Sequence, residues 1–340
     1  MTHSRRSARP AVLLFCMATQ AFAHHSAAIY DTGQTVSIEG VVRGMQWANP
    51  HVYINMEQTT ESGAKVAWAV EALPPAAMRR LGWTEQTLKP GDTLKVSGNP
   101  TRRTRNRGIY PATIEVGGVT LFQSATNIQR LASATIEPAV AATSLEGTWE
   151  TLANVDLYVF FYRSAMQLTE AGQRARDSYD EATMLPAREC MPYSSPLLMI
   201  DPDFKQITIG TDTITINGGF APAERTIHLN LSSHDGAAAS LQGHSIGHWE
   251  GTTLVIDTRH FAEHRIGNGY RGIASGAQKH LVERLTLQDN GTRLSYSFEL
   301  NDPEYLAGPV TGSAEWAYRP DLEFVREPCD LSNAQEFRND

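Results

Sequence analysis

The 340-residue chain is poor in cysteine, of which it has three, and it lacks long apolar runs. The apolar stretch at residues 11–17 is too short to span a bilayer, and no later stretch approaches that length. Positive charge is also scarce, because 29 basic side chains face 37 acidic ones and the net charge is −8. These absences argue against membrane insertion and against nucleic acid as a partner.

The first 23 residues have the pattern of a secretory signal peptide. Arg5, Arg6 and Arg9 form a basic start, residues 11–17 form a short apolar core, and Ala21-Phe22-Ala23 is a typical cleavage site. Cleavage there removes three arginines, which leaves 26 basic against 37 acidic side chains and a net charge of −11. We therefore expect a periplasmic or secreted protein whose mature chain begins at His24.

Only Cys190 and Cys329 remain after this cleavage. In an oxidising compartment such a pair predicts one disulfide, which would stabilise the fold by about 3–5 kcal/mol. A reactive thiol is the alternative, but neither cysteine has an adjacent histidine or a CxxC spacing.

Residues 24–122 have the strand and turn pattern of a small barrel of the oligonucleotide-binding (OB) type. A helix is expected at residues 74–81, and another short one at 84–88. Residues 123–143, rich in Ala, Ser and Thr, are interpreted as a linker with a possible helix at 127–132. The expected strands are residues 35–45, 51–57, 65–70, 93–98 and 112–122.

This first part resembles a family of secreted bacterial domains of unknown function. The resemblance rests on the mature start His24-His25-Ser26, on Tyr30-Asp31, on the W-x-N-P-H motif Trp47-Ala48-Asn49-Pro50-His51, on Trp68 and on residues 88–92. It covers residues 24–122 and implies no reaction.

Residues 144–340 predict a second, larger antiparallel β-barrel of the lipocalin-like type. The chain enters it through Gly147-Thr148-Trp149, and one good helix is expected at 169–178 with Thr169 as its N-cap. A barrel of eight to ten strands is wide enough to hold one small ligand. The expected strands are residues 157–161, 196–200, 206–209, 213–217, 225–229, 244–249, 253–257, 279–288, 293–300 and 312–318.

The second part also resembles a group of uncharacterised secreted bacterial proteins with a lipocalin-like domain. The shared motif, GHSIGxWEGxTLVxDT, corresponds to residues 243–258, and two shorter motifs lie at 280–284 and 301–303. This resemblance covers residues 145–329 and again implies no chemistry.

The processed N-terminus is the sharpest candidate for chemistry. There the α-amine and the imidazole of His24 would chelate one metal ion together, and a second histidine would complete a three-nitrogen arrangement that suits Cu(II). His51 is the natural second ligand, with His25 as its competitor. The alternative is an N-terminus whose histidines bind nothing.

Seven of the eleven histidines lie between His228 and His280. On a strand, His244 and His248 would be about 13 Å apart, too far to share an ion. We expect instead that His244, Asp257 and Glu283 line a barrel cavity, where a histidine and carboxylates suit acid–base catalysis. The alternative is structural: a core hairpin, with Glu283 and Arg284 on opposite strand faces and each paired.

Two functions follow as hypotheses. The first is a copper- or small-ligand-binding accessory protein that uses His24 and His51. The second is an enzyme of the hydratase, dehydratase or isomerase type, which acts on a hydrophobic small molecule in the second barrel through His244, Asp257 and Glu283.

Overall fold

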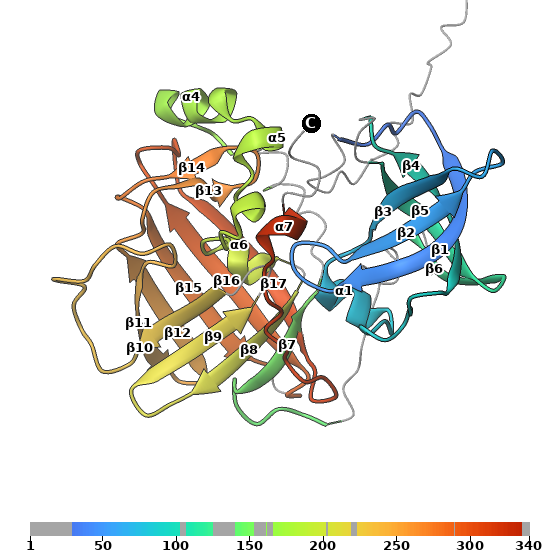
Figure 1. The fold of residues 1–340 in the computed structure, drawn as a ribbon. Coiled ribbons are helices and arrows are strands. Elements are labelled where there is room, and N and C mark those ends of the chain that lie inside the picture. Colours follow the sequence, from blue (N-terminus) through green and yellow to red (C-terminus); the bar gives the residue numbers. More distant parts are fainter. Residues whose placement is uncertain are drawn as a thin grey trace, which may run out of the picture.

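The computed structural model describes residues 29–102, 107–124, 140–152, 161, 166–201, 203–218, 223–288 and 290–334. The expected signal peptide, His24, His25, most of the expected linker with its helix, and all but the last residue of the strand expected at 157–161 lie outside these residues. Strands make up 47% of the described residues and helices 12%, so the all-β prediction is confirmed. Figure 1 shows the two barrels side by side.

The first barrel has five strands in the order β3-β2-β1-β4-β5 and is closed by a parallel pairing of β3 with β5. Helix α1 (Pro75–Arg80) lies between β3 and β4, and this order confirms the OB-like prediction. Val42, Ile54 and Val96 are fully buried in its core. The strands are β1 (Val36–Gln46), β2 (Tyr53–Thr59), β3 (Lys65–Glu71), β4 (Thr93–Pro100) and β5 (Gly108–Val116), and β6 (Val119–Gln123) continues the sheet beyond β5.

Two elements of this barrel differ from the sequence-based expectation. The single strand expected at residues 112–122 is a hairpin, because Gly117 and Gly118 have φ angles of 56° and 81° and turn the chain between β5 and β6. Residues 84–88 form turns in place of a helix.

The second barrel is closed by nine strands in the order β10-β11-β12-β15-β16-β17-β7-β8-β9. Neighbouring strands are antiparallel except β10 and β11, which run parallel over two residue pairs. The chain between these two strands, residues 229–243, therefore crosses from one end of the barrel to the other. The strands are β7 (Gly147–Thr151), β8 (Phe204–Ile209), β9 (Thr213–Gly218), β10 (Ala223–His228), β11 (His244–Glu250), β12 (Thr253–Arg259), β15 (His280–Leu287), β16 (Arg293–Asn301) and β17 (Val310–Tyr318).

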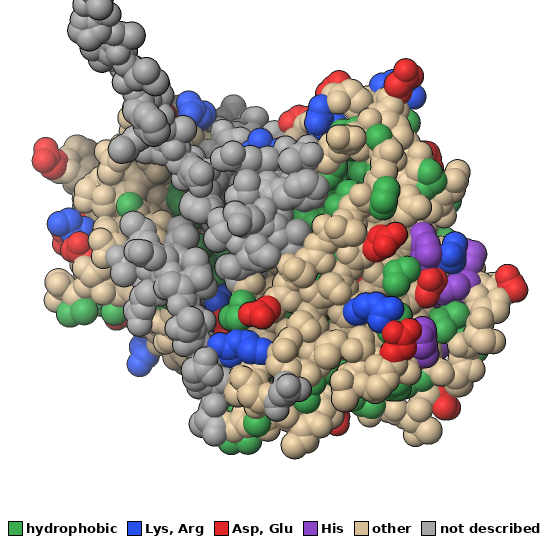
Figure 2. Space-filling model, turned by 180° about the vertical axis from the view of Figure 1, so that it is seen from behind, with side chains coloured by type: hydrophobic (Ala, Val, Ile, Leu, Met, Phe, Trp, Pro, Cys, Tyr) green, Lys and Arg blue, Asp and Glu red, His purple; other side chains and the backbone are tan. Residues whose placement is uncertain are grey.

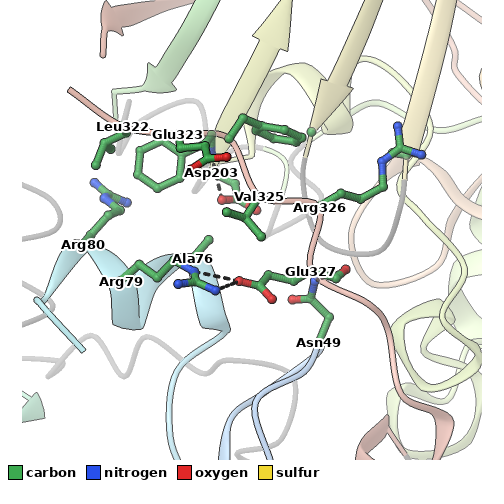
Figure 3. Close-up of a pocket in the computed structure, with 14 residues that line it drawn as sticks. Asn49, Ala76, Arg79, Arg80, Asp203, Leu322, Glu323, Val325, Arg326 and Glu327 are labelled. Atoms are coloured by element: carbon green, nitrogen blue, oxygen red, sulfur yellow. Dashed lines mark hydrogen bonds and ion pairs between the residues drawn. The ribbon is translucent and has the colours of Figure 1, made fainter. Parts of the chain in front are cut away.

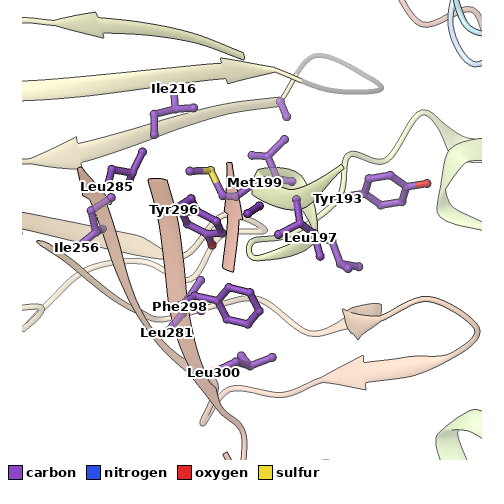
Figure 4. Close-up of a cluster of buried hydrophobic side chains, with 14 of the residues drawn as sticks. Tyr193, Leu197, Met199, Ile216, Ile256, Leu281, Leu285, Tyr296, Phe298 and Leu300 are labelled. Carbon is purple, nitrogen blue, oxygen red and sulfur yellow. The ribbon is translucent and has the colours of Figure 1, made fainter. Parts of the chain in front are cut away.

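A short helix, α6 (Leu197–Ile200), packs into the second barrel, and all four of its residues are buried. Figure 4 shows Leu197 and Met199 beside Tyr296 and Phe298 of β16. The prediction of a strand over residues 196–200 is therefore wrong. A run of four apolar residues is too short for its periodicity to distinguish a strand from a buried helix, and Leu and Met are good helix formers.

Helix α4 (Glu170–Ser178) confirms the expected helix, and the Thr169 hydroxyl accepts a hydrogen bond from Gly172 N at 3.1 Å. It contacts a small two-stranded sheet that the sequence analysis missed, β13 (His264–Gly269) with β14 (Ile273–Ser275). The remaining short helices are α5 (Glu181–Met184), η2 (Pro186–Glu189) and α7 (Leu331–Ala334). Among the helices of the described residues, none is both long and apolar enough to cross a bilayer.

After β17 the chain leaves the second barrel as a C-terminal tail (residues 319–334) and reaches the first barrel. The predicted disulfide joins Cys190 to Cys329 in this tail, with the two Cα atoms 5.8 Å apart. On either side of Cys329, Asn49 N donates to Pro328 O at 2.9 Å and Asp330 N donates to Asn49 O at 3.0 Å. The tail is thus bonded covalently to one barrel and by backbone hydrogen bonds to the other.

Candidate functional site

His51 lies directly before β2, at the point where the chain pairs with the end of β3. Its Nδ1 lies 2.9 Å from Ala72 O, and because a carbonyl oxygen only accepts, Nδ1 must carry the proton. In the neutral ring this leaves Nε2 unprotonated, and Nε2 makes no hydrogen bond to any described residue. The His51 side chain is 13% exposed, and in the neutral ring its Nε2 bears a lone pair.

A buried carboxylate supports this imidazole. Glu71 Oε1 lies 3.6 Å from His51 Nδ1, and Glu71 Oε2 accepts a hydrogen bond from the Tyr30 hydroxyl at 2.6 Å. Burial and the Glu71 charge raise the pKa of Tyr30 well above its usual value, so this hydroxyl stays a donor. Oε1 is buried and has no hydrogen-bond partner among the described residues. A histidine that gives its other N–H to a carbonyl or carboxylate is the usual arrangement around a metal ligand.

The tail of the second barrel holds the segment that carries His51. Besides the two backbone hydrogen bonds of Asn49, the Asn333 amide donates to His51 O at 3.4 Å and Trp47 Nε1 donates to Glu327 Oε1 at 3.3 Å. The W-x-N-P-H motif is therefore a contact between the two barrels as well as part of the first.

A second group of titratable side chains lies on the outer face of the larger barrel, and we call it the histidine cluster. It comprises His228, His234, His244, Asp257, His260 and His280. Figure 2 shows histidines gathered on one face of the molecule beside acidic and basic side chains. His244, Asp257 and His280 come from the neighbouring strands β11, β12 and β15, and His234 comes from the loop after β10.

A chain of hydrogen bonds runs through the cluster. The Asp257 carboxylate accepts from His280 Nε2 at 2.7 Å and from His234 Nε2 at 2.9 Å. His234 Nδ1 lies 2.9 Å from His244 Nδ1. The His228 ring stacks on the His244 ring, with centroids 5.1 Å apart.

These contacts shift the pKa values of two members. Burial opposes ionisation of Asp257, but the hydrogen bond and charge of His280, the hydrogen bond of His234 and the charge of Arg259 together lower its pKa. Partial desolvation and the neighbouring histidine charges lower the pKa of His244. These shifts favour an ionised Asp257 beside a neutral His244 ring.

Glu283 belongs to a different group inside the barrel. It forms a bidentate ion pair with Arg225 and accepts from the Tyr296 hydroxyl at 2.8 Å. Arg225 also donates to Ser245 at 3.1 Å and to Thr258 at 2.8 Å. All of these side chains are buried, and they form a paired polar layer within the apolar core.

The three residues expected to form one acid–base site therefore do not converge. His244 and Asp257 share the outer face, joined through His234, whereas Glu283 points inward. The reason is strand alternation, because Glu283 pairs with Ile256, which is buried, and the adjacent Asp257 points to the other side. The structural alternative describes Glu283 and Arg284 well, since Arg284 pairs on the outside with Glu250 at 2.7 Å.

A groove opens where the two barrels meet, and it encloses about 650 Å³ when its space open to solvent is included. Helix α1, the start of β8 and the tail line it, and Figure 3 shows the Arg79–Glu327 ion pair that crosses it. Arg80 of the first barrel and Arg319 of the tail both pair with Glu150 of β7. Because charged side chains of the first barrel, the second barrel and the tail pair with one another here, we interpret the groove as part of the contact between the two barrels.

The match to a known protein family falls on the N-terminal part of the chain. A model described as "Family of unknown function (DUF6152)" matches residues 11–110, which include the W-x-N-P-H motif. The first barrel thus resembles an uncharacterised domain. No curated protein matches the chain.

One similar solved structure is that of a "REP1-NXSQ fatty acid transporter". It is 12% identical, and the alignment covers 53% of this chain and 98% of that chain with a TM-score of 0.26. A TM-score this low carries no argument about fold or ligand.

In the part of the chain that the structure describes, no three His, Cys, Asp or Glu side chains are grouped to hold a metal ion. His24 and His25 lie outside that part. His234 was not among the predicted site residues, because it is ten positions from His244 and is brought to it by a loop. Glu71 was not among them either, and its place beside His51 follows from the β2–β3 register.

Proposed function

We propose that this protein is a copper- or small-ligand-binding accessory protein of the periplasm or extracellular space. The metal is held by the processed N-terminal residue His24 and by His51, with His25 as the competing ligand. Neither the activity nor the cofactor follows from the family match, which concerns a family of unknown function.

The observation that carries the proposal is the fixed tautomer of His51. Its Nδ1–H is directed to Ala72 O, and in the neutral ring Nε2 is left as a lone-pair donor. Imidazole nitrogen is a ligand that copper favours, and a tetragonal set of nitrogens suits Cu(II). The buried Glu71 carboxylate beside the ring adds the negative charge that stabilises a nearby cation.

The position of the first described residues also supports the proposal. The Tyr30 hydroxyl is bonded to Glu71, which also contacts His51, so the chain is anchored close to the proposed ligand. Five peptide units separate His24 from Ile29. An extended chain of that length reaches about 17 Å, which is enough for the N-terminus to meet the imidazole.

The disulfide supports the proposed location, because such bonds persist in oxidising compartments. The signal-peptide pattern of residues 1–23 agrees with export. The excess of acidic side chains favours a cationic or neutral ligand over nucleic acid.

One specific observation supports the enzyme hypothesis. Asp257 bonds His234, and His234 bonds His244, so an acid–base relay lies on the outer face of the second barrel. Acid–base catalysis at this place would use His244 and Asp257. Glu283 could not take part, because it is buried against Arg225. Copper binding remains the better supported of the two proposals.

The test is a Cu(II) titration of the mature chain that begins at His24, followed by electron paramagnetic resonance. We expect one tightly bound equivalent of copper with nitrogen coordination. A glycine added before His24 and the variant His51→Gln should each weaken binding at least tenfold. His248→Gln is the matched control, since this exposed histidine pairs with Glu250. Unchanged copper affinity in the extended chain or in His51→Gln would contradict the proposal.

A further inference from the structure

The histidine cluster holds a contact that the proposed copper site does not use. His234 and His244 face each other through the same ring atom, and their Nδ1 nitrogens are 2.9 Å apart. Two imidazole nitrogens at this distance must share a proton, because two bare lone pairs would repel each other.

The neighbouring carboxylate decides which ring carries that proton. Asp257 only accepts when ionised, so His234 Nε2 is protonated and, in the neutral ring, His234 Nδ1 bears a lone pair. His244 Nδ1 is therefore the donor of the shared proton. If His244 changes tautomer and moves that proton to Nε2, the two Nδ1 lone pairs face each other across one gap and no proton is lost.

We infer that the His234–His244 pair is a binding site for a divalent transition metal ion such as Zn²⁺, separate from the proposed N-terminal copper site. In a tetrahedral site with metal–nitrogen distances of about 2.0–2.1 Å, two ligand nitrogens lie about 3.3 Å apart. The pair needs to open by about 0.4 Å for an ion to replace the proton. Rings that share one such ion have centroids about 5 Å apart, and these two centroids are 5.1 Å apart.

The surroundings suit such an ion. Asp257 accepts from the distal nitrogen of His234, which orients that ring and increases its basicity. His260, whose ring centroid lies 6.2 Å from that of His234, is the nearest candidate for a third ligand. Water completes the coordination. His228 stacks on His244 and fixes the plane of that ring.

The test is a Zn²⁺ titration by calorimetry at pH 7.5, with a chain that carries one extra residue before His24 so that the N-terminal chelate is blocked. We expect one equivalent of zinc. Its affinity should fall at least tenfold in His234→Ala and in His244→Ala, and by about 10–100-fold in Asp257→Asn, which removes the carboxylate that orients His234. His248→Ala is the matched control, because His248 lies on the same strand and outer face but pairs with Glu250.

A spectroscopic measurement separates loss of the site from loss of the fold. In the histidine side-chain ¹⁵N spectrum of the unsubstituted chain, zinc should shift the Nδ1 signals of His234 and His244 and leave those of His248 in place. Zinc that binds equally well in His244→Ala, or that shifts neither Nδ1 signal, would overturn the inference. Because the N-terminal chelate is blocked throughout, neither result bears on the proposed copper site.

Discussion

At the residue scale, the most consequential interaction is the buried ion pair between Arg225 and Glu283. Each partner is almost fully buried, and each makes a further hydrogen bond. The Tyr296 hydroxyl donates to the Glu283 carboxylate, and the Arg225 guanidinium donates to Ser245. A charge in such a place is tolerated only while its partner and hydrogen bonds remain. Burial and the Glu283 charge also raise the pKa of Tyr296 well above its usual value, so its hydroxyl stays a donor.

We expect Glu283→Gln to destabilise the protein by about 3–5 kcal/mol, because it leaves the Arg225 charge buried without compensation. Denaturant unfolding measures this loss. The double variant Arg225→Met/Glu283→Leu should recover much of the stability, since it removes both charges. Glu250→Gln is the matched control, because this carboxylate pairs with Arg284 in solvent and should have little effect. If Glu283→Gln has the same unfolding free energy as the unsubstituted protein, the Glu283 carboxylate does not stabilise the fold, and the hypothesis that it is catalytic would be favoured.

At the element scale, alternation and register decide which side chains meet. Strand alternation places His244 and Ile246 on one face of β11 and Ser245 on the other. It does not predict that Glu283 of β15 is opposite Ile256, since register between strands 27 residues apart depends on packing of the whole barrel. The meeting of His234 with His244 depends on a loop of irregular conformation, for which the sequence has no periodic signal.

Helix α4 is the element whose start the sequence predicts best, because Thr169 is a favourable N-cap residue. Thr169→Ala should cost about 1 kcal/mol, since Gly172 N loses its acceptor. The loss should appear as faster amide hydrogen exchange in the first turn of α4. Ser178→Ala at the other end of the helix is the control, because its exposed hydroxyl bonds only Ala175 O. Equal exchange rates in the two variants would show that the cap does not stabilise α4.

At the scale of the whole molecule, the two barrels are joined by more than the connecting chain. The disulfide fixes the tail to the second barrel, the tail pairs with Asn49, and Arg80 bonds Glu150 across the boundary. Burial lowers the pKa of Arg80, and the charge of Glu150 opposes that shift. The pairing of two cysteines 139 residues apart was predictable because no other cysteine remains after the expected cleavage. The contacts of the tail with the first barrel could not be predicted, because residues 319–334 have no strand or helix period that would indicate a partner.

Reduction of the disulfide, or the variant Cys329→Ser, should remove up to about 5 kcal/mol of stability, because the cross-link closes a long loop. It should also expose the tail around Val325 to proteases. Thermal unfolding with and without reductant, and limited proteolysis, measure the two effects. The double variant Cys190→Ser/Cys329→Ser should not respond to reductant. A melting temperature that reductant leaves unchanged in the unsubstituted protein would contradict the role of the cross-link.

The hydrogen bonds between the tail and the bend at Asn49–His51 have a consequence for biosynthesis. The tail residues that hold this bend, Pro328, Asp330 and Asn333, are translated almost three hundred residues after it. The tail therefore holds the bend only after every strand of both barrels has been translated. A polypeptide cut short by a frameshift after Tyr318 would retain every strand of both barrels and still leave His51 unsecured.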